Sequence, residues 1–175
     1  MIELMILYVL TKRELTMYSI QKFIGENFGA YSKPSFGAIK PALTRLEKTN
    51  CLTTRKTMSD GGKPSVYYTI TKEGMSELKR LILEPLSENP LQFLSNARIK
   101  LSAASFLDKE ECSDLFFSIK SLAVKHKFDA ENIINDEYNH LSFYQRIVLD
   151  NTICEYANFI NIIESLEKEN AGNSK

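Results

Sequence analysis

The stretch that decides the fold is Ser35–Glu47, SFGAIKPALTRLE, followed by Leu52–Ile70, LTTRKTMSDGGKPSVYYTI. Apolar residues recur at helical spacing in the first part, at Ile39, Ala42, Leu43 and Leu46. They predict a helix from about Ser35 to Thr49 with one buried stripe. The second part contains two runs of strand composition around a Gly- and Pro-containing turn, which predicts a β-hairpin with a basic tip.

Helices are expected on both sides of this core sequence. Apolar periodicity predicts one helix over Ile2–Lys12 and a second from about Leu15 to Gly29. After the hairpin, Thr71 is expected to cap a helix that runs to about Leu86. Three helices, a hairpin and a further helix are the order of elements in a winged helix-turn-helix. We therefore assign residues 1–86 to a winged helix-turn-helix domain.

The C-terminal part is predicted to be helical. Pro85 and Pro90 mark a boundary, and residues 91–170 form the second region. Asp108 and Glu111 have capping-box spacing, and a final helix is expected from about Ser142 to Lys168. Within this helix, apolar residues recur at alternating intervals of four and three residues. This spacing predicts a helical dimerisation surface at Leu149, Ile153, Tyr156, Ile160 and Ile163. The predicted fold class is mainly α, with a small β-hairpin wing and a C-terminal helical dimerisation region.

Charge is divided unevenly between the two halves. Residues 1–80 hold 13 Lys and Arg against 7 Asp and Glu, whereas residues 81–175 hold 9 against 15. The whole chain has a formal net charge of zero. A basic half joined to an acidic half is typical of a protein in which one half binds a polyanion, although chance segregation of solvated charges explains it equally well.

The exposed face of the Ser35–Thr49 helix is the candidate DNA-binding surface. When Ile39 and Leu43 face inward, the rotation of 100° per residue along the helix places three cations on the outward face. No acidic residue lies on that face. A helix fits the major groove of duplex DNA, and the free N–H groups of its first turn can hold a phosphate. The candidate DNA-binding residues are Ser35, Gly37, Lys40, Thr44, Arg45 and Lys48 in the helix, and Arg55, Lys56, Lys63 and Ser65 in the hairpin. Three cations alone also fit an ordinary solvated helix, but the adjacent hairpin favours DNA binding.

These residues resemble a known family. Ser35–Glu47 is similar to the recognition-helix pattern S-x-G-x-[IL]-Y-P-x-L-x-R-L-E of the PadR (phenolic acid decarboxylase regulator) family. Gly61-Gly62-Lys63, the segment from Tyr67 to Gly74, and Tyr18-Ser19-Ile20 resemble the wing, the start of the following helix and an earlier G-Y-x-I segment of that family. The chain departs from the pattern at Lys40, where the family usually has Tyr, and at Met17, where it usually has Gly.

The resemblance implies a ligand-responsive repressor. It implies a homodimer on a pseudo-palindromic operator in double-stranded DNA, with tetramers also open, and repression relieved by a small aromatic or lipophilic effector. In this chain an effector pocket would use Phe93, Phe106, Tyr138, Phe143 and Tyr144. Ordinary packing in a core or interface is the alternative role for those five aromatic side chains.

Other classes of protein fit the sequence less well. His126 and His140 have no ligand-like spacing, and no Gly-rich loop follows a strand, so we expect neither an enzyme nor a metal or cofactor. Three widely spaced cysteines indicate reduced thiols, and the apolar start is too short to span a membrane, so we expect a cytoplasmic protein. The alternative function is a winged-helix adaptor that binds proteins without reading DNA sequence.

Overall fold

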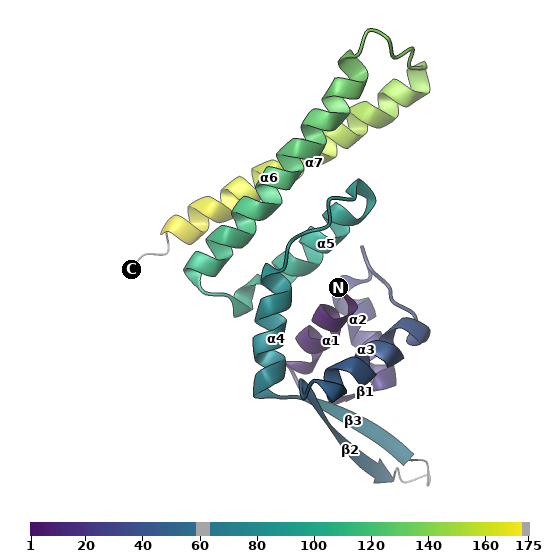
Figure 1. Cartoon of the computed structure of the whole chain (residues 1–175), viewed down its shortest axis with the longest axis vertical. Coiled ribbons are helices and arrows are strands. Elements are labelled where there is room, and N and C mark those ends of the chain that lie inside the picture. The colour runs from purple at the N-terminus through teal and green to yellow at the C-terminus, as the bar shows by residue number, and fades with distance from the viewer. Residues whose placement is uncertain (59–63, 173–175) are drawn as a thin grey trace. The chain divides into compact units, whose positions relative to one another are not determined.

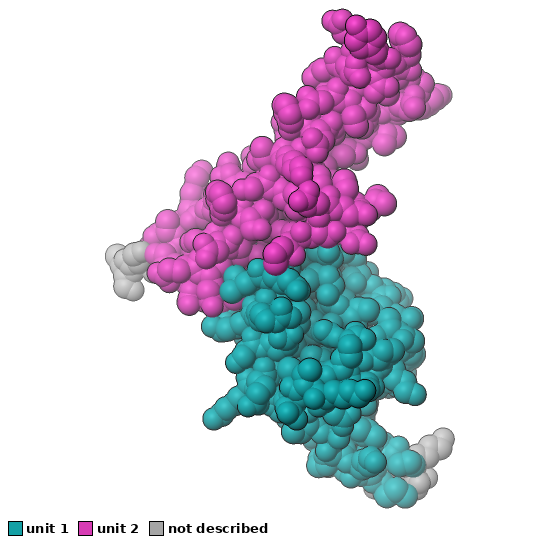
Figure 2. Space-filling view, viewed as in Figure 1, with its two compact units in different colours: residues 1–84, 94–106 teal, residues 85–93, 107–175 magenta. Residues whose placement is uncertain are grey.

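The computed structural model describes residues 1–58 and 64–172, which divide into two compact units (Figures 1 and 2). Unit 1 comprises residues 1–84 and 94–106. Unit 2 comprises residues 85–93 and the chain from Leu107 onward. The sequence boundary placed residues 91–170 in one region, whereas residues 94–106 group with the N-terminal unit in the structure. The assignment of separate functions to the two units remains a prediction.

Unit 1 is organised around α1 (Ile2–Leu10), which packs against α2 (Met17–Phe28), α3 (Phe36–Lys48) and α4 (Lys72–Leu83). The mostly apolar sequence of α1 explains its central place, because a helix that is hydrophobic on all sides is stable only when it is covered. Each of the other three helices contributes a single apolar stripe to the core. The fully buried side chains include Leu4, Leu7, Ile20, Ile24, Ile39, Leu78 and Ile82. The fold is a winged helix-turn-helix, as the sequence predicted.

The wing belongs to a three-stranded antiparallel sheet. Strands β2 (Leu52–Met58) and β3 (Pro64–Ile70) pair over their full length, and the two-residue strand β1 (Leu15–Thr16) joins the other edge of β3. Leu15 and Thr16 were predicted to begin a helix, and this prediction was wrong. Two residues are too short to show strand alternation, and Thr16 acts instead as the N-cap of α2 by accepting a hydrogen bond from the Ser19 N–H.

Local signals fix most helix ends in unit 1. Asn50 adopts a left-handed conformation with φ of 57° just after α3, as expected for a residue that ends a helix. The Thr71 hydroxyl accepts a hydrogen bond from the Gly74 N–H at 3.0 Å and caps α4. That helix ends at Leu83 rather than Leu86, because Pro85 disfavours helical backbone at Glu84, whose ψ of 144° is not helical.

Residues 94–102 of helix α5 (Pro90–Ser102) and the short 3-10 helix η1 (Ala104–Phe106) complete the helical part of unit 1. Two serines attach α5 to the loop after α2: the Ser95 hydroxyl donates to the Tyr31 carbonyl, and the Ser102 and Tyr31 hydroxyls lie 2.8 Å apart. The Lys100 side chain is buried and donates to the Glu84 carbonyl just beyond the end of α4. Burial lowers the pKa of Lys100 to about 8.

Unit 2 is dominated by two long helices, α6 (Lys109–Asn135) and α7 (Phe143–Gly172), which run side by side in opposite directions (Figure 1). Asp108 and Glu111 form the predicted capping box at the start of α6. On the outer edge of the pair, the Lys120 ammonium lies 3.2 Å from Glu164 and 2.9 Å from Glu167. Within the residues that the structure describes, no helix is long and apolar enough to cross a membrane.

Candidate nucleic-acid interface

Helix α3 separates its side chains into a buried stripe and an exposed face. Ile39, Ala42, Leu43 and Leu46 are at most 2% exposed and belong to the core of unit 1. The opposite face carries the residues that the helical periodicity turned outward, and all of them are exposed: Gly37, Lys40, Thr44, Arg45 and Lys48. The orientation of the helix was therefore predicted correctly, while contact of these residues with DNA remains a prediction.

Ser35 marks the start of α3. Ser35 occupies the N-cap position with extended backbone, but its hydroxyl makes no capping hydrogen bond to the helix. The Ser35 carbonyl accepts from the N–H groups of Ala38 and Ile39 instead. The exposed hydroxyl and the first N–H groups of α3 thus lie together at the positive end of the helix dipole, where a phosphate would be stabilised.

Two of the predicted DNA-binding arginines have acidic partners within the protein. The Arg45 guanidinium lies 2.6 Å from a Glu3 carboxylate oxygen, and that of Arg55 lies 2.5 Å from Glu14. Arg55 also lies over the Tyr67 ring, 5.1 Å from its centroid. Both side chains are more than half exposed, so these pairs are screened by solvent and contribute little to stability.

Three lysines on the same elements have no such partner among residues 1–58 and 64–172. In the part of the chain that the structure describes, no ion pair involves Lys40 and Lys48 of α3 or Lys56 of β2. All three side chains are exposed. These lysines are consequently the cations of this surface that a polyanion would meet without displacing a carboxylate.

The β2–β3 hairpin extends from the helices of unit 1 (Figure 1). Its register pairs Lys56 with Val66 and Thr57 with Ser65. Ser65 is half-buried, and Lys56 is exposed. Lys63, which the sequence assigned to DNA binding at the hairpin tip, lies outside the described residues. A two-stranded ribbon of this kind is narrow enough to enter a DNA groove or to follow a phosphate backbone.

An aromatic pair beside α3 was not among the predicted site residues. The rings of Tyr18 on α2 and Phe36, the first residue of α3, are stacked with centroids 6.3 Å apart and planes 20° apart. Tyr18 is 70% exposed and Phe36 is 40% exposed. The helical spacing of Phe36 and Lys40 places the Phe36 ring next to a cation, but it gives no sign of Tyr18 on α2.

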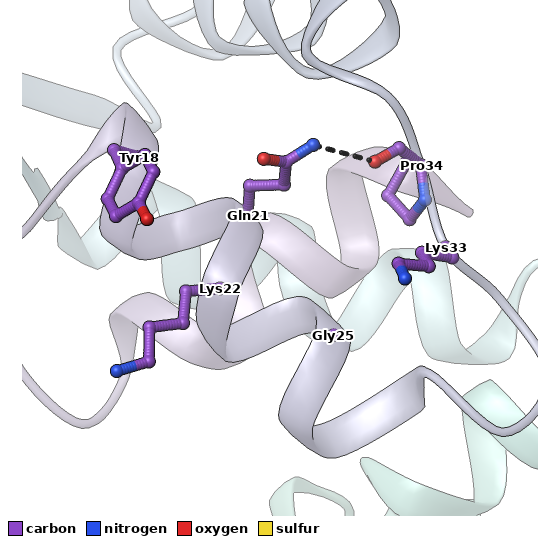
Figure 3. Close-up of a pocket in the computed structure, with 6 residues that line it drawn as sticks. All are labelled: Tyr18, Gln21, Lys22, Gly25, Lys33 and Pro34. Atoms are coloured by element: carbon purple, nitrogen blue, oxygen red, sulfur yellow. Dashed lines mark hydrogen bonds between the residues drawn. The ribbon is translucent and has the colours of Figure 1, made fainter.

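Tyr18 also lines a hollow of about 320 Å³ between α2 and the loop that leads to α3 (Figure 3). The other lining residues are Gln21, Lys22, Gly25, Lys33 and Pro34. The Gln21 amide donates to the Pro34 carbonyl at 3.4 Å and joins the loop to α2. Lys33 and Lys22, which lies 3.9 Å from a Glu26 carboxylate oxygen, place two cations at the hollow beside Tyr18.

The predicted dimerisation residues lie along one side of α7. Tyr156 and Ile163 are buried within the chain, and Leu149, Ile153 and Ile160 are half-buried. Tyr156 stacks on His126 of α6 with ring centroids 5.6 Å apart. The periodicity of this stripe therefore reflects, at least for its buried members, packing of α7 against α6 in the same chain.

The five residues suggested for an effector pocket occupy different environments. Phe93 is buried with His126, Tyr156 and Phe159 in unit 2, and Phe106 contacts Tyr8 in unit 1. Tyr138, Phe143 and Tyr144 are strongly exposed near the turn between α6 and α7. Of the five, Tyr144 lines a hollow of about 420 Å³, which it shares with Ile133, Leu141, Gln145, Val148 and Leu149.

Comparison with known proteins identifies the N-terminal part of the chain. Residues 6–80 match the transcriptional regulator PadR-like family. The chain carries a PadR-like domain. This domain includes the exposed face of α3, the aromatic pair and the wing, so the resemblance that the recognition-helix motif suggested is confirmed.

Relatives of the PadR-like domain include a curated regulator and solved structures. The chain is 29% identical over 113 residues to the negative transcriptional regulator PadR of Bacillus subtilis, a match that covers 63% of this chain and 60% of that protein. A crystal structure of Bacillus subtilis PadR with operator DNA is 23% identical, with a TM-score of 0.44, and the match covers 96% of this chain and 98% of the other. The PadR-like regulator BC1756 of Bacillus cereus is 20% identical, with a TM-score of 0.42, over 99% and 100% of the two chains.

Proposed function

We propose that this protein is a transcriptional regulator that binds duplex DNA through α3 and the wing of its PadR-like domain. The observation that carries the proposal is the exposed face of α3, where Lys40 and Lys48 lie without acidic partners among the described residues and beside the hydroxyl of Thr44. Lysine contacts to phosphates supply affinity, and side chains near the start of a recognition helix read base edges. The family match at residues 6–80 supports the same function.

A homodimer is the proposed functional form. Exposed apolar side chains gather at the hollow near the turn of the α6–α7 pair, where Ile133, Tyr144 and Val148 are 44%, 80% and 65% exposed. Covering such side chains with a second copy removes apolar surface from water. Leu149 lines the same hollow and belongs to the predicted dimerisation stripe. A twofold dimer would present two copies of α3 to a pseudo-palindromic operator.

Repression is the proposed sign of regulation, because the curated relative is named as a negative regulator. The resemblance to that family also supports control by a small aromatic or lipophilic effector. We propose that the effector binds within this dimer interface, where Tyr144 and the apolar side chains around the hollow would contact it. A protein with this function acts in the cytoplasm on its own or a neighbouring promoter.

Salt-dependent binding to a promoter fragment tests the proposal. We expect the full chain to shift a fragment from its own promoter, with an affinity that falls steeply as salt rises because phosphate contacts release counterions. Lys48→Ala is expected to lower the slope of log affinity against log salt by about one unit. Lys168→Ala, an exposed lysine change on α7, is the matched control and should leave the slope unchanged.

The outcome separates the regulator from the protein-binding adaptor. An adaptor would bind promoter and unrelated duplexes equally weakly, and Lys48→Ala would alter neither. Sequence-selective binding that Lys48→Ala weakens and Lys168→Ala does not is the result that supports the regulator.

A further inference from the structure

Phe36 is an apolar ring in an unusual place on α3. The other large apolar side chains of the helix are directed into the core, whereas the Phe36 ring remains 40% exposed at the first helical position. Residues near the start of a recognition helix are those that approach base edges in the major groove. The ring is consequently placed where DNA would be read, if the proposed function holds.

The ring of Tyr18 stacks against the Phe36 ring. The two rings are nearly parallel, and Tyr18 comes from α2 rather than from the same helix. Stacking between residues of two different helices restricts the Phe36 side chain to a defined orientation. A ring that is fixed in this way loses little conformational entropy when a further apolar group packs against it.

Three lysines lie on the elements that carry the aromatic pair or border it. Lys40 lies one helical turn after Phe36 on the same side of α3, and Lys22 and Lys33 border the hollow next to Tyr18 (Figure 3). A phosphate backbone attracted by Lys22 and Lys33 would bring the bases of the groove to the exposed edge of the pair. An apolar group presented by the duplex would cover the exposed part of the ring and remove it from water.

Duplex DNA presents one apolar group at the base edges of its major groove, the C5-methyl group of thymine. We propose that the Tyr18–Phe36 pair reads a thymine methyl group in each half-site and so determines sequence preference at that position. This inference rests on the proposed DNA-binding function. It adds a specificity residue, Phe36, that charge and hydrogen bonding on the α3 face do not account for.

Replacement of thymine by deoxyuridine tests the inference, because it removes the methyl group and leaves the base pair intact. Duplexes are first enriched from a random library by repeated binding to the full chain. Each thymine of the enriched site is then replaced singly, and dissociation constants are measured. We expect one thymine in each half-site to lose roughly fourfold in affinity on replacement, the effect of one buried methyl group.

Variants connect that effect to the ring. In Phe36→Ala the enriched duplex and its deoxyuridine derivative should bind equally, and Phe36→Leu should retain part of the difference. Phe117→Ala removes an exposed ring from α6, away from α3, and is the matched control, expected to discriminate as the unchanged protein does. Thermal unfolding of each variant shows whether the fold is retained, and the scan with the unchanged protein stands independently of any variant.

The possible failures are distinguishable. A library that yields no enriched sequence overturns the proposed function and this inference with it. An enriched site at which no thymine replacement matters overturns this inference alone, as does equal discrimination by Phe36→Ala and the unchanged protein.

Discussion

The guanidinium of Arg45, on the exposed face of α3, lies 2.6 Å from a carboxylate oxygen of Glu3 on α1. Arg45 is part of the resemblance to the recognition-helix motif, yet in the free protein its charge is partly neutralised by an acid more than 40 residues away in sequence. The pair lies at the surface, with Arg45 61% exposed, so DNA phosphates can compete with Glu3 for the same guanidinium.

Glu3→Gln is expected to strengthen DNA binding. Without the carboxylate, Arg45 needs no exchange of partners to contact a phosphate, so affinity should rise severalfold and the salt slope should increase by about one unit. Titration of one promoter fragment at several salt concentrations measures both quantities. Glu131→Gln, which removes the partner of Lys127 on α6, is the control. Weaker binding by Glu3→Gln would show instead that Glu3 orients Arg45 for DNA.

Substitutions on the α3 face and in the wing should distinguish residues that read base edges from residues that contact the DNA phosphates. Lys48→Ala and Lys63→Ala are expected to weaken binding equally for all sequences, each with a salt slope lower by about one unit. Lys40→Ala and Thr44→Ala are expected to alter the preferred sequence, because these residues are nearer the start of the helix. Selection from a random duplex library compares the preferences. Unchanged affinity and preference in all four variants would contradict the assigned face.

The central packing of the helix-turn-helix could be predicted from the sequence because it depends on periodicity. Ile39 and Leu43 are spaced for burial on one side of a helix, and that spacing alone fixes which residues face outward. The Tyr18–Phe36 stack and the Arg45–Glu3 pair could not be predicted in this way. Each joins residues from different helices, and the spacing within one helix contains no information about its neighbour.

The same limit explains what was missed in the C-terminal half. The stripe that includes Tyr156 and Ile163 was assigned to contact between chains, but those two side chains pack within the chain. An apolar stripe shows that a helix needs a partner, and it does not distinguish α6 from a second copy. Lys100 gave no signal at all, since its burial follows from the position of the Glu84 carbonyl, which only the fold defines.

His126 should make the protein sensitive to acid. The imidazole is 5% exposed, its Nε2 atom has no hydrogen-bond partner in the part of the chain that the structure describes, and burial lowers its pKa below 6.5. Near this side chain are Lys125 and Asp129 on α6, Glu88 before α5, and Tyr156 on α7. Below pH 6.5 the unfolded chain therefore binds more protons than the folded chain, so stability falls as pH decreases.

His126→Phe is expected to remove this part of the pH dependence, because an aromatic ring of similar shape replaces the titratable group. Denaturant unfolding between pH 7.5 and about 5 measures the free energy of unfolding of each protein. The other histidine of the chain, His140, is exposed, so His140→Phe should retain the acid sensitivity. Equal pH dependence in His126→Phe and the unchanged protein would disprove the assignment.

Two changes on α7 should have opposite effects on assembly and on stability. Val148 is 65% exposed at the proposed dimer surface, so Val148→Asp should convert dimers to monomers without lowering the stability of the fold. Tyr156 is 4% exposed in the core of unit 2, so Tyr156→Ala should cost ~3 kcal/mol of unfolding free energy through loss of packing.

Sedimentation gives the oligomeric state of each variant, and denaturant unfolding gives its stability. Asn151→Asp, an exposed change on the same helix, controls for added charge. If Val148→Asp still sediments as a dimer, the interface lies elsewhere and the apolar side chains around the hollow need another partner.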